Sequence, residues 1–347
     1  MVEWMRNDKV SAPAAGLDYT STARRPGWLD LPAPVRDLLS DWVGGRIDAV
    51  EIAGGGFTHG FAAVLRGPRP LFAKAIPVDD PHIAPAYARE VEVLAALPPG
   101  APIPQLVEDD VLAGWRVFAT TALDGWMPGA PWTLSDARAI HDSCLLTNRL
   151  LENAAGALPA LELLEEQWAA GISELDGGHL VLDIGRRPDY LPSWFTGPSG
   201  DELARSILQA ASRIETALHG PVPLNNDLRA DNVLISSAPS CGFPAGTAWI
   251  CDWNFLASGP GWADWVVLWP QMHDGGMDLQ EIASWELTST ADAADLDTWL
   301  SALFIYYAAT GTREPLPTSP NLRSHQQLCA LQTLELLALR FGSHDQA

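Results

Sequence analysis

The sequence predicts an α+β fold in two lobes. Residues 49–76 contain three short apolar runs separated by glycine-rich turns, the pattern of an antiparallel meander of strands. From residue 135 onward, apolar residues recur every three or four positions over long segments, which is typical of helices. With 347 residues, the chain is long enough for two such units, each with its own core. We therefore expect a five-stranded antiparallel sheet plus a helix in the first lobe, and a mostly helical second lobe.

The composition narrows the classes of function. At 47% hydrophobic and 18% charged residues, the chain is typical of globular proteins. Its formal net charge of −22 argues against nucleic-acid binding, which needs a basic surface. No apolar run approaches the ~20 residues that span a bilayer, so no membrane partner is expected. The four cysteines lack C-x-x-C spacing, which argues against a zinc site or a disulfide framework and suits a reducing cytoplasm.

The first lobe is expected at residues 28–122, after a loose N-terminal arm at residues 1–27. Pro32 or Pro34 suits a first helical turn, and Gly44 ends that short helix. A second helix is expected at 85–97, where two prolines stop it. The strands of this lobe are expected at 49–53, 61–65, 71–76, 102–107 and 115–121.

Lys74 is the most informative residue of the first lobe. It stands inside an apolar strand, where a lysine must find a partner or reach the surface. It either faces solvent from an edge strand, or binds nucleotide phosphates while a glutamate of the following helix holds it. Glu90 borders the apolar face of that helix, so we prefer it to Glu92 as the partner.

The glycine-rich turn at residues 54–60 suits a close approach of backbone N–H groups to phosphate oxygens. Two better-known glycine motifs do not fit it. Phe61 and Ala62 stand where a Walker A loop requires Lys and Ser or Thr. A Rossmann motif opens a helix, whereas this turn opens a strand-like run.

The second lobe is expected at residues 123–347. Ser135 is a candidate cap for a helix that runs to about Glu152. Residues 158–200 are irregular and rich in Trp, Pro, Gly and acidic residues, which is typical either of a binding element or of ordinary surface loops. Further helices are expected at 201–218, 294–309 and 321–341.

Polar residues follow two short apolar runs of this lobe. Asp227 and Asn232 lie five positions apart and lead directly into the apolar run 233–235. Asp252 follows another apolar run at 247–251. Phosphoryl transfer from a nucleotide needs one carboxylate to orient the attacking hydroxyl, and an amide with a second carboxylate to hold the metal. A strand-loop-strand unit would bring these three side chains together.

The order and spacing of these motifs resemble the aminoglycoside phosphotransferase family, whose fold is similar to that of choline kinases and protein kinases. The resemblance covers about residues 46–270 and rests on the glycine turn, Lys74 and Glu90, the stretch 227–235, Asp252, and the run 259–264. It implies a bilobal, protein kinase-like fold. It also implies a small-molecule kinase that uses Mg²⁺ and takes ATP or GTP as co-substrate.

The resemblance also implies a role for each site residue. Asp227 would be the catalytic base, and Asp264 would brace the catalytic loop. Arg229 would neutralise charge on the moving phosphoryl group, or would simply face solvent. Asn232 and Asp252 would hold magnesium. The nucleotide would bind to Lys74, Glu90, Gly55, Gly56 and Thr58, with Thr121 and Leu123 in the hinge that meets the base.

One position departs from the family pattern. The family usually has His two positions before the catalytic Asp, where this chain has Asn225. That His is a scaffold residue that holds the loop by hydrogen bonds, and Asn donates a similar bond with a shorter reach. We expect an active enzyme, with a binding-only pseudokinase as the alternative.

The sequence indicates less about the acceptor molecule than about the reaction. An aminoglycoside needs carboxylates around its ammonium groups, whereas a neutral sugar or nucleoside would stack on aromatic walls. We expect a hydroxyl-bearing antibiotic and a resistance enzyme; a choline-like or sugar metabolite kinase is the alternative. The candidate carboxylates are Glu165, Glu166, Asp176, Asp231 and Asp274, and the candidate wall residues are Trp126, Trp132, Trp168, Trp194 and Trp262.

Overall fold

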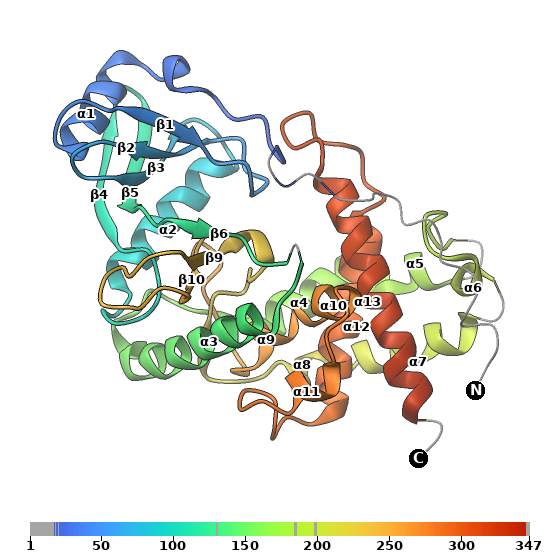
Figure 1. Ribbon diagram of the computed structural model, residues 1–347. Coiled ribbons are helices and arrows are strands. Elements are labelled where there is room, and N and C mark those ends of the chain that lie inside the picture. Colours follow the sequence, from blue (N-terminus) through green and yellow to red (C-terminus); the bar gives the residue numbers. More distant parts are fainter. Residues whose placement is uncertain are drawn as a thin grey trace.

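The computed structural model describes residues 17, 19, 21–129, 131–183, 186–197 and 200–344. Most of the expected N-terminal arm, residues 1–16, 18 and 20, therefore lies outside the described residues. Figure 1 shows the predicted two lobes, with a sheet and two helices in the first and mostly helices in the second. None of the described helices is both long and apolar enough to cross a bilayer.

The first lobe contains the expected five-stranded antiparallel sheet. Its fourth strand begins at Leu106 rather than at 102, because Pro102 and Pro104 have no N–H group to donate to a neighbouring strand. The strand order across the sheet is β1 (Ala49–Ile52), β2 (Phe61–Arg66), β3 (Leu71–Pro77), β5 (Trp115–Thr121) and β4 (Leu106–Leu112).

The two helices of this lobe pack on opposite faces of the sheet. Helix α1 (Ala33–Val43) contributes Val35 and Leu39 to a buried cluster with Ala73 of β3. Helix α2 (Ile83–Ala96) contributes Tyr87 and Val93 to the other core. Because side chains alternate along a strand, Lys74 lies on the α2 side when Ala73 faces α1.

Helices of the second lobe differ in detail from those expected. Helix α3 (Leu134–Ala154) is capped by Thr133, whose side chain accepts the N–H of Asp136, and not by Ser135. Residues 158–200 are less irregular than expected, with α4 (Leu164–Glu174) and the short α5 (His179–Leu182) and α6 (Ser193–Thr196).

The helix expected at 201–218 is divided into α7 (Asp201–Ala211) and α8 (Ile214–Ala217). The hydroxyl of Ser212 donates to the oxygen of Gln209 at this break, a side-chain bond that competes with the helix.

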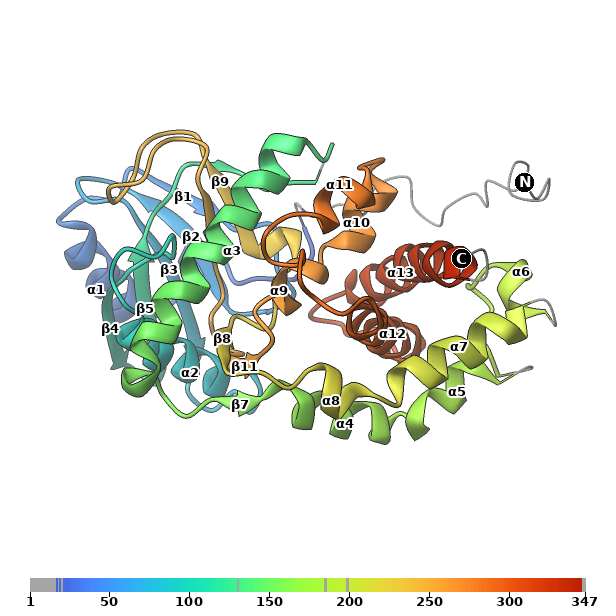
Figure 2. The ribbon, with the colours of Figure 1, turned by 90° about the horizontal axis from the view of Figure 1, so that it is seen from below.

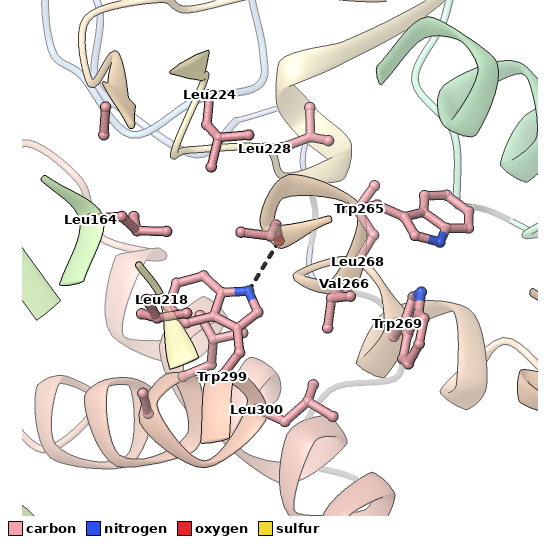
Figure 3. Packing of buried hydrophobic residues seen from close by; sticks show 14 of the residues in the cluster. Leu164, Leu218, Leu224, Leu228, Trp265, Val266, Leu268, Trp269, Trp299 and Leu300 are labelled. Atoms are coloured by element: carbon pink, nitrogen blue, oxygen red, sulfur yellow. Dashed lines mark hydrogen bonds between the residues drawn. The ribbon is translucent and has the colours of Figure 1, made fainter. Parts of the chain in front are cut away.

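The core of the second lobe is rich in tryptophan. Trp249, Trp253, Trp265 and Trp269 are fully buried. Figure 3 shows the hydrogen bond from the Trp299 ring to the main-chain oxygen of Ala263, which is 3.0 Å long. Helices α12 (Ala293–Thr310) and α13 (Leu322–His344) lie side by side in both ribbon views (Figures 1 and 2).

Short elements carry the stretches for which the sequence predicts chemistry. Strands β9 (Val233–Ser236) and β10 (Ala248–Ile250) pair antiparallel, and β9 also pairs with β6 (Gly125–Trp126). Val233 is opposite Ile250, so Asn232 and Asp252 lie at the same end of the pair. The other short elements are β7 (Glu162–Leu163), β8 (Val222–Leu224), the 3₁₀ helix η6 (Ala230–Asn232), β11 (Ala257–Gly259), α9 (Ala263–Val266), α10 (Trp269–Asp274) and α11 (Leu279–Ala283).

Candidate active site

Lys74 projects from β3 into a cleft of about 560 Å³ that is lined by residues of both lobes. Its Nζ lies 2.8 and 2.7 Å from the two carboxylate oxygens of Glu90, and 3.1 Å from Oδ1 of Asp252. Only 12% of the Lys74 side chain is exposed, so the solvent-facing interpretation is wrong. Burial works to lower the pKa of Lys74, but Asp252 and Glu90 outweigh it and raise that pKa above its ordinary value. Glu92 instead pairs with Arg89 at the surface.

Asp227 lies in the loop between β8 and η6. Nδ2 of Asn232 donates to the main-chain oxygen of Asp227 at 2.8 Å and to its Oδ2 at 3.0 Å. The guanidinium of Arg229 contacts Oδ1 of Asp227 and donates from Nε to Asp231 at 3.0 Å, so Arg229 does not point freely into solvent. Burial raises the pKa of Asp227 to about 7; Asp252 and Asp231 add to the rise, and Arg229 opposes it.

Asn232 and Asp252 offer a pair of oxygen ligands at the cleft. The amide nitrogen of Asn232 is bonded to Asp227, which leaves Oδ1 as the ligand atom. Burial works to raise the pKa of Asp252, but Lys74 outweighs it and lowers that pKa, so the carboxylate stays charged. Oxygen donors of these two kinds suit Mg²⁺. Within the described parts of the chain, no cluster of three or more His, Cys, Asp or Glu residues could hold a metal, so magnesium here would need phosphate and water ligands as well.

Asn225 and Asp264 hold the loop that carries Asp227. The Asp264 carboxylate accepts the N–H groups of Asn225 and Asn226 at 2.8 and 2.9 Å. Burial raises the pKa of Asp264 to about 6, and these two hydrogen bonds act against the rise. The side chain of Asn225 accepts the N–H of Asp227 at 3.1 Å and donates to the main-chain oxygen of Asp252 at 3.0 Å. Asn225 therefore makes scaffold hydrogen bonds of the kind expected of a His at this position.

The glycine loop lines the same cleft with Gly55, Gly56 and Thr58. Gly56 has a φ angle of 76°, a conformation that favours glycine. Its N–H donates to Oδ2 of Asp231 at 3.2 Å. The loop thus already binds an anionic oxygen, which is the contact that a phosphate oxygen would make.

The described part of the expected arm packs against this loop and is not loose. Nη2 of Arg25 donates to the oxygen of Gly55 at 2.7 Å, and Nη1 donates to that of Gly60 at 3.1 Å. The N–H of Thr22 donates to the oxygen of Gly54 at 3.1 Å. Arg25 also lines the cleft and forms no ion pair with a carboxylate of the described residues. No motif and no periodic pattern of apolar residues in 1–27 identifies Arg25 as a residue of the site.

The turn that precedes α13 reaches the same region from the far end of the chain. In Figure 1 the blue segment before α1 crosses to this red turn. The N–H of Arg24 donates to the oxygen of Thr318 at 2.9 Å, and Nδ2 of Asn321 donates to that of Ser21 at 3.1 Å. The hydroxyl of Ser319 donates to the main-chain oxygen of Phe57 in the glycine loop.

Thr121 and Leu123 line the cleft where the hinge was expected. The N–H of Thr121 donates to the oxygen of Gln105 at 2.9 Å, and its hydroxyl accepts the N–H of Gln105 at 3.1 Å. The amide of Thr121 is therefore engaged within the first lobe. That Leu123 meets the nucleotide base stays a prediction.

A second cavity, of about 290 Å³, has Asp227 and Arg229 in its lining. Its walls include Trp168 of α4 and Tyr306 of α12, whose ring centroids are 5.5 Å apart. Because Asn232 lines the larger cleft and Asp227 lines this cavity, the hydrogen bond between them joins the two spaces.

Most of the residues expected to surround an acceptor do not line the second cavity. None of the five candidate carboxylates lines the second cavity: Asp231 lines the larger cleft, and Glu165 and Glu166 line a separate surface hollow. Of the five candidate tryptophans, only Trp168 lines it. No pattern in the sequence marked the other aromatic residues of the lining, which are Phe255, Trp299, Tyr306 and Tyr307.

No family model and no curated protein sequence matches the chain. Among solved structures, a spectinomycin phosphotransferase in complex with AMP matches with a TM-score of 0.54 at 12% identity, over 88% of this chain and 97% of its own. A macrolide 2′-phosphotransferase from Brachybacterium faecium has a TM-score of 0.47 at 14% identity, over 87% and 98% of the two chains. An aminoglycoside phosphotransferase from Streptomyces rimosus, with ADP and streptomycin, has a TM-score of 0.44 at 17% identity, over 88% and 99%. The first of these matches confirms the predicted fold: the chain has the two-lobed, kinase-like fold of the spectinomycin phosphotransferase.

Proposed function

We propose that the protein is an O-phosphotransferase that moves the γ-phosphoryl group of ATP or GTP to a hydroxyl group of a small molecule. The observation that carries this proposal is the hydrogen bond between Asn232 and Asp227, because it joins two cavities of different character. The larger cleft holds Lys74 and Asp252, which suit phosphates and a metal. The smaller cavity has aromatic walls, which suit an organic acceptor.

Each group at the junction would have its own part in the reaction. Lys74, held by Glu90, binds the nucleotide phosphates. Asn232 and Asp252 would hold Mg²⁺, which neutralises phosphate charge when bound. Asp227 orients the acceptor hydroxyl and takes its proton, and a pKa of about 7 suits a base near neutral pH.

The transfer itself breaks one bond and forms another. The bond between the γ-phosphorus and the oxygen that bridges it to the β-phosphate breaks as the bond to the acceptor oxygen forms, and the nucleoside diphosphate leaves. Arg229, in contact with Asp227, provides positive charge near the phosphoryl group as it moves.

The acceptor that we propose is an antibiotic, which would make the protein a resistance enzyme. The shared fold with a protein named spectinomycin phosphotransferase supports this proposal. A cytoplasmic location belongs to the same proposal and is supported by the four cysteines, all of which are free thiols.

An acceptor screen with readout by mass spectrometry tests the function. The protein is incubated with Mg-ATP or Mg-GTP and a panel of hydroxyl-bearing antibiotics, sugars and amino alcohols, and each acceptor is inspected for the added mass of one phosphate. We expect transfer that Asp227→Asn lowers by about 10²–10⁴-fold, the usual contribution of a general base, without loss of Mg-nucleotide binding. An unchanged rate in that variant would show that the assigned base is wrong.

Transfer only to a sugar or an amino alcohol would indicate a metabolic kinase. Failure to bind Mg-nucleotide would contradict the function as a whole.

A further inference from the structure

The second cavity is built mainly from rings and aliphatic side chains. Helix α4 contributes Leu164, Trp168 and Ile172, and α12 contributes Trp299 and Tyr306. The Trp168 ring lies edge-on to Trp299, with centroids 4.5 Å apart, so the wall is continuous from one helix to the other. Such a wall favours a flat or apolar body over a strongly hydrated one.

The carboxylates in the described lining of this cavity are Asp227 and Asp264, and both are already engaged. Asp227 contacts Arg229 and accepts a hydrogen bond from Asn232. Asp264 accepts two main-chain N–H groups and serves the loop, not the cavity. An ammonium group in this space would therefore lose water without gaining an unpaired anion, which is costly.

Among the described residues that line the cavity, Arg229 is the one cation. Burial raises the pKa of Tyr306; Asp227 adds to the rise, and Arg229, Arg313 and Arg323 act against it. Although the chain carries a net charge of −22, the described lining of this cavity therefore offers one cation, Arg229, and no free carboxylate.

We infer that the acceptor is an uncharged alcohol with a ring-shaped, mostly apolar body, and that polycationic aminoglycosides are not substrates. This inference rests on the proposed function, since it assigns the second cavity to the acceptor. A volume of about 290 Å³ is at the small end for ligand sites, so the cavity fits a small alcohol or one ring of a larger molecule.

Binding measured by saturation-transfer NMR tests the inference with three probes of defined charge and shape. The full-length protein is saturated with Mg-ADP before each probe is added. The first probe is 4-nitrophenyl β-glucoside, which is uncharged and has an aromatic ring. The others are kanamycin, which is polycationic, and fully N-acetylated kanamycin, which keeps the hydroxyl groups without the charge. We expect the glucoside to bind at least tenfold more tightly than kanamycin, and N-acetylation to improve kanamycin binding.

Two variants of Tyr306 test whether the preference for an uncharged probe arises in the second cavity. Tyr306→Glu adds a carboxylate to the wall and is expected to weaken binding of the glucoside and strengthen that of kanamycin, each by at least fivefold. Tyr306→Phe, the matched control, should change both by less than threefold. Because Tyr306 is 37% exposed, both variants should fold.

The outcomes separate the inference from the function on which it rests. The inference is overturned if kanamycin binds as tightly as the glucoside, if the glucoside does not bind to protein that holds Mg-ADP, or if Tyr306→Glu leaves both affinities unchanged. In each of these cases the proposed phosphotransferase still stands. Failure to bind Mg-ADP would instead overturn the proposed function.

Discussion

The side-chain amide of Asn225 donates to the main-chain oxygen of Asp252 across 3.0 Å. The same side chain accepts the N–H of Asp227 at 3.1 Å, so one fully buried residue positions both the proposed base and a proposed metal ligand. The spacing between Asp227 and Asp252 therefore depends on Asn225, although Asn225 lines neither cavity.

Asn225→Ala should disrupt this spacing. It removes both hydrogen bonds and leaves buried polar groups unpaired, which costs about 1–3 kcal/mol of stability. A displacement of the base near 1 Å would lower kcat by about 100-fold. Urea unfolding measures the first effect, and transfer to an acceptor found by the screen measures the second. Asn225→His, which introduces the residue that the resembled family usually has there, should keep most of the activity. Equal kcat values in Asn225→Ala and the parent would refute the scaffold role.

Lys74→Met should destabilise the fold as well as remove nucleotide binding. The change leaves the buried carboxylate of Glu90 without its cation, which typically costs about 3–5 kcal/mol. Adding Glu90→Gln should recover part of the stability but none of the binding. Chemical denaturation and Mg-nucleotide titration follow the two effects separately. The control is Glu92→Gln at the surface, which should change unfolding by less than about 0.5 kcal/mol.

Arg25→Ala should weaken nucleotide binding by at least about tenfold, because charge-assisted hydrogen bonds of this kind contribute roughly 1.5–3 kcal/mol. Arg25 fixes two main-chain oxygens of the glycine loop and places a cation in the cleft. Calorimetric titration with Mg-ADP measures the effect. Arg24→Ala is the matched control, since the main chain of Arg24 makes its contact with Thr318. If both variants bind equally well, Arg25 has no part in the nucleotide site.

His325 should make stability depend on pH. Tyr19 Oη lies 2.8 Å from Nδ1 of this buried ring. Burial lowers the pKa of His325 to about 4, with Arg229 adding to the fall and Asp231 opposing it. Since the unfolded chain has a His pKa of about 6.5, it binds more protons than the folded protein between pH 4 and 6.5. The contribution of His325 to the free energy of unfolding is therefore complete above about pH 6.5, and it is lost as the pH falls toward 4.

The size of this effect can be measured by difference. Between pH 8 and pH 5, linkage gives a loss of about 2 kcal/mol from His325. Urea unfolding at several pH values should therefore show a flatter profile for His325→Gln than for the parent. His179→Gln, at a side chain that is 58% exposed, should keep the parental slope. Parallel profiles for all three proteins would contradict the assignment.

Local patterns indicated which residues of the larger cleft would lie close together. Lys74 and Glu90 come from neighbouring elements, and a lysine inside an apolar strand signals a buried partner. Asn232 directly precedes β9, and Asp252 follows β10 after one intervening residue, so the strand pairing itself brings them to one end. These relationships depend on the alternation of side chains along a strand and on strand pairing, both of which the short apolar runs in the sequence indicate.

The second cavity and the support of the glycine loop could not be predicted in the same way. Helix α12 is apolar on nearly every side, so periodicity does not show that Tyr306 rather than a neighbour would line a cavity. Arg25 acts through contacts with a loop some 30 positions away, and no periodic signal accompanies it. Asp231 was expected near an acceptor, but it binds Gly56 and Arg229 instead.

The contacts between Ser21 and Asn321 also bear on how the protein is made. These residues are 300 positions apart, yet they meet beside the glycine loop. A chain that is still being synthesised can form the sheet of the first lobe early, because its strands are close in sequence. Arg25 and Thr22 can hold its glycine loop early, but the contact of Ser319 with that loop can form only after residues 318–321 have left the ribosome. Competence to bind nucleotide would then be one of the last properties that a newly made molecule acquires, and a prematurely terminated chain would lack it.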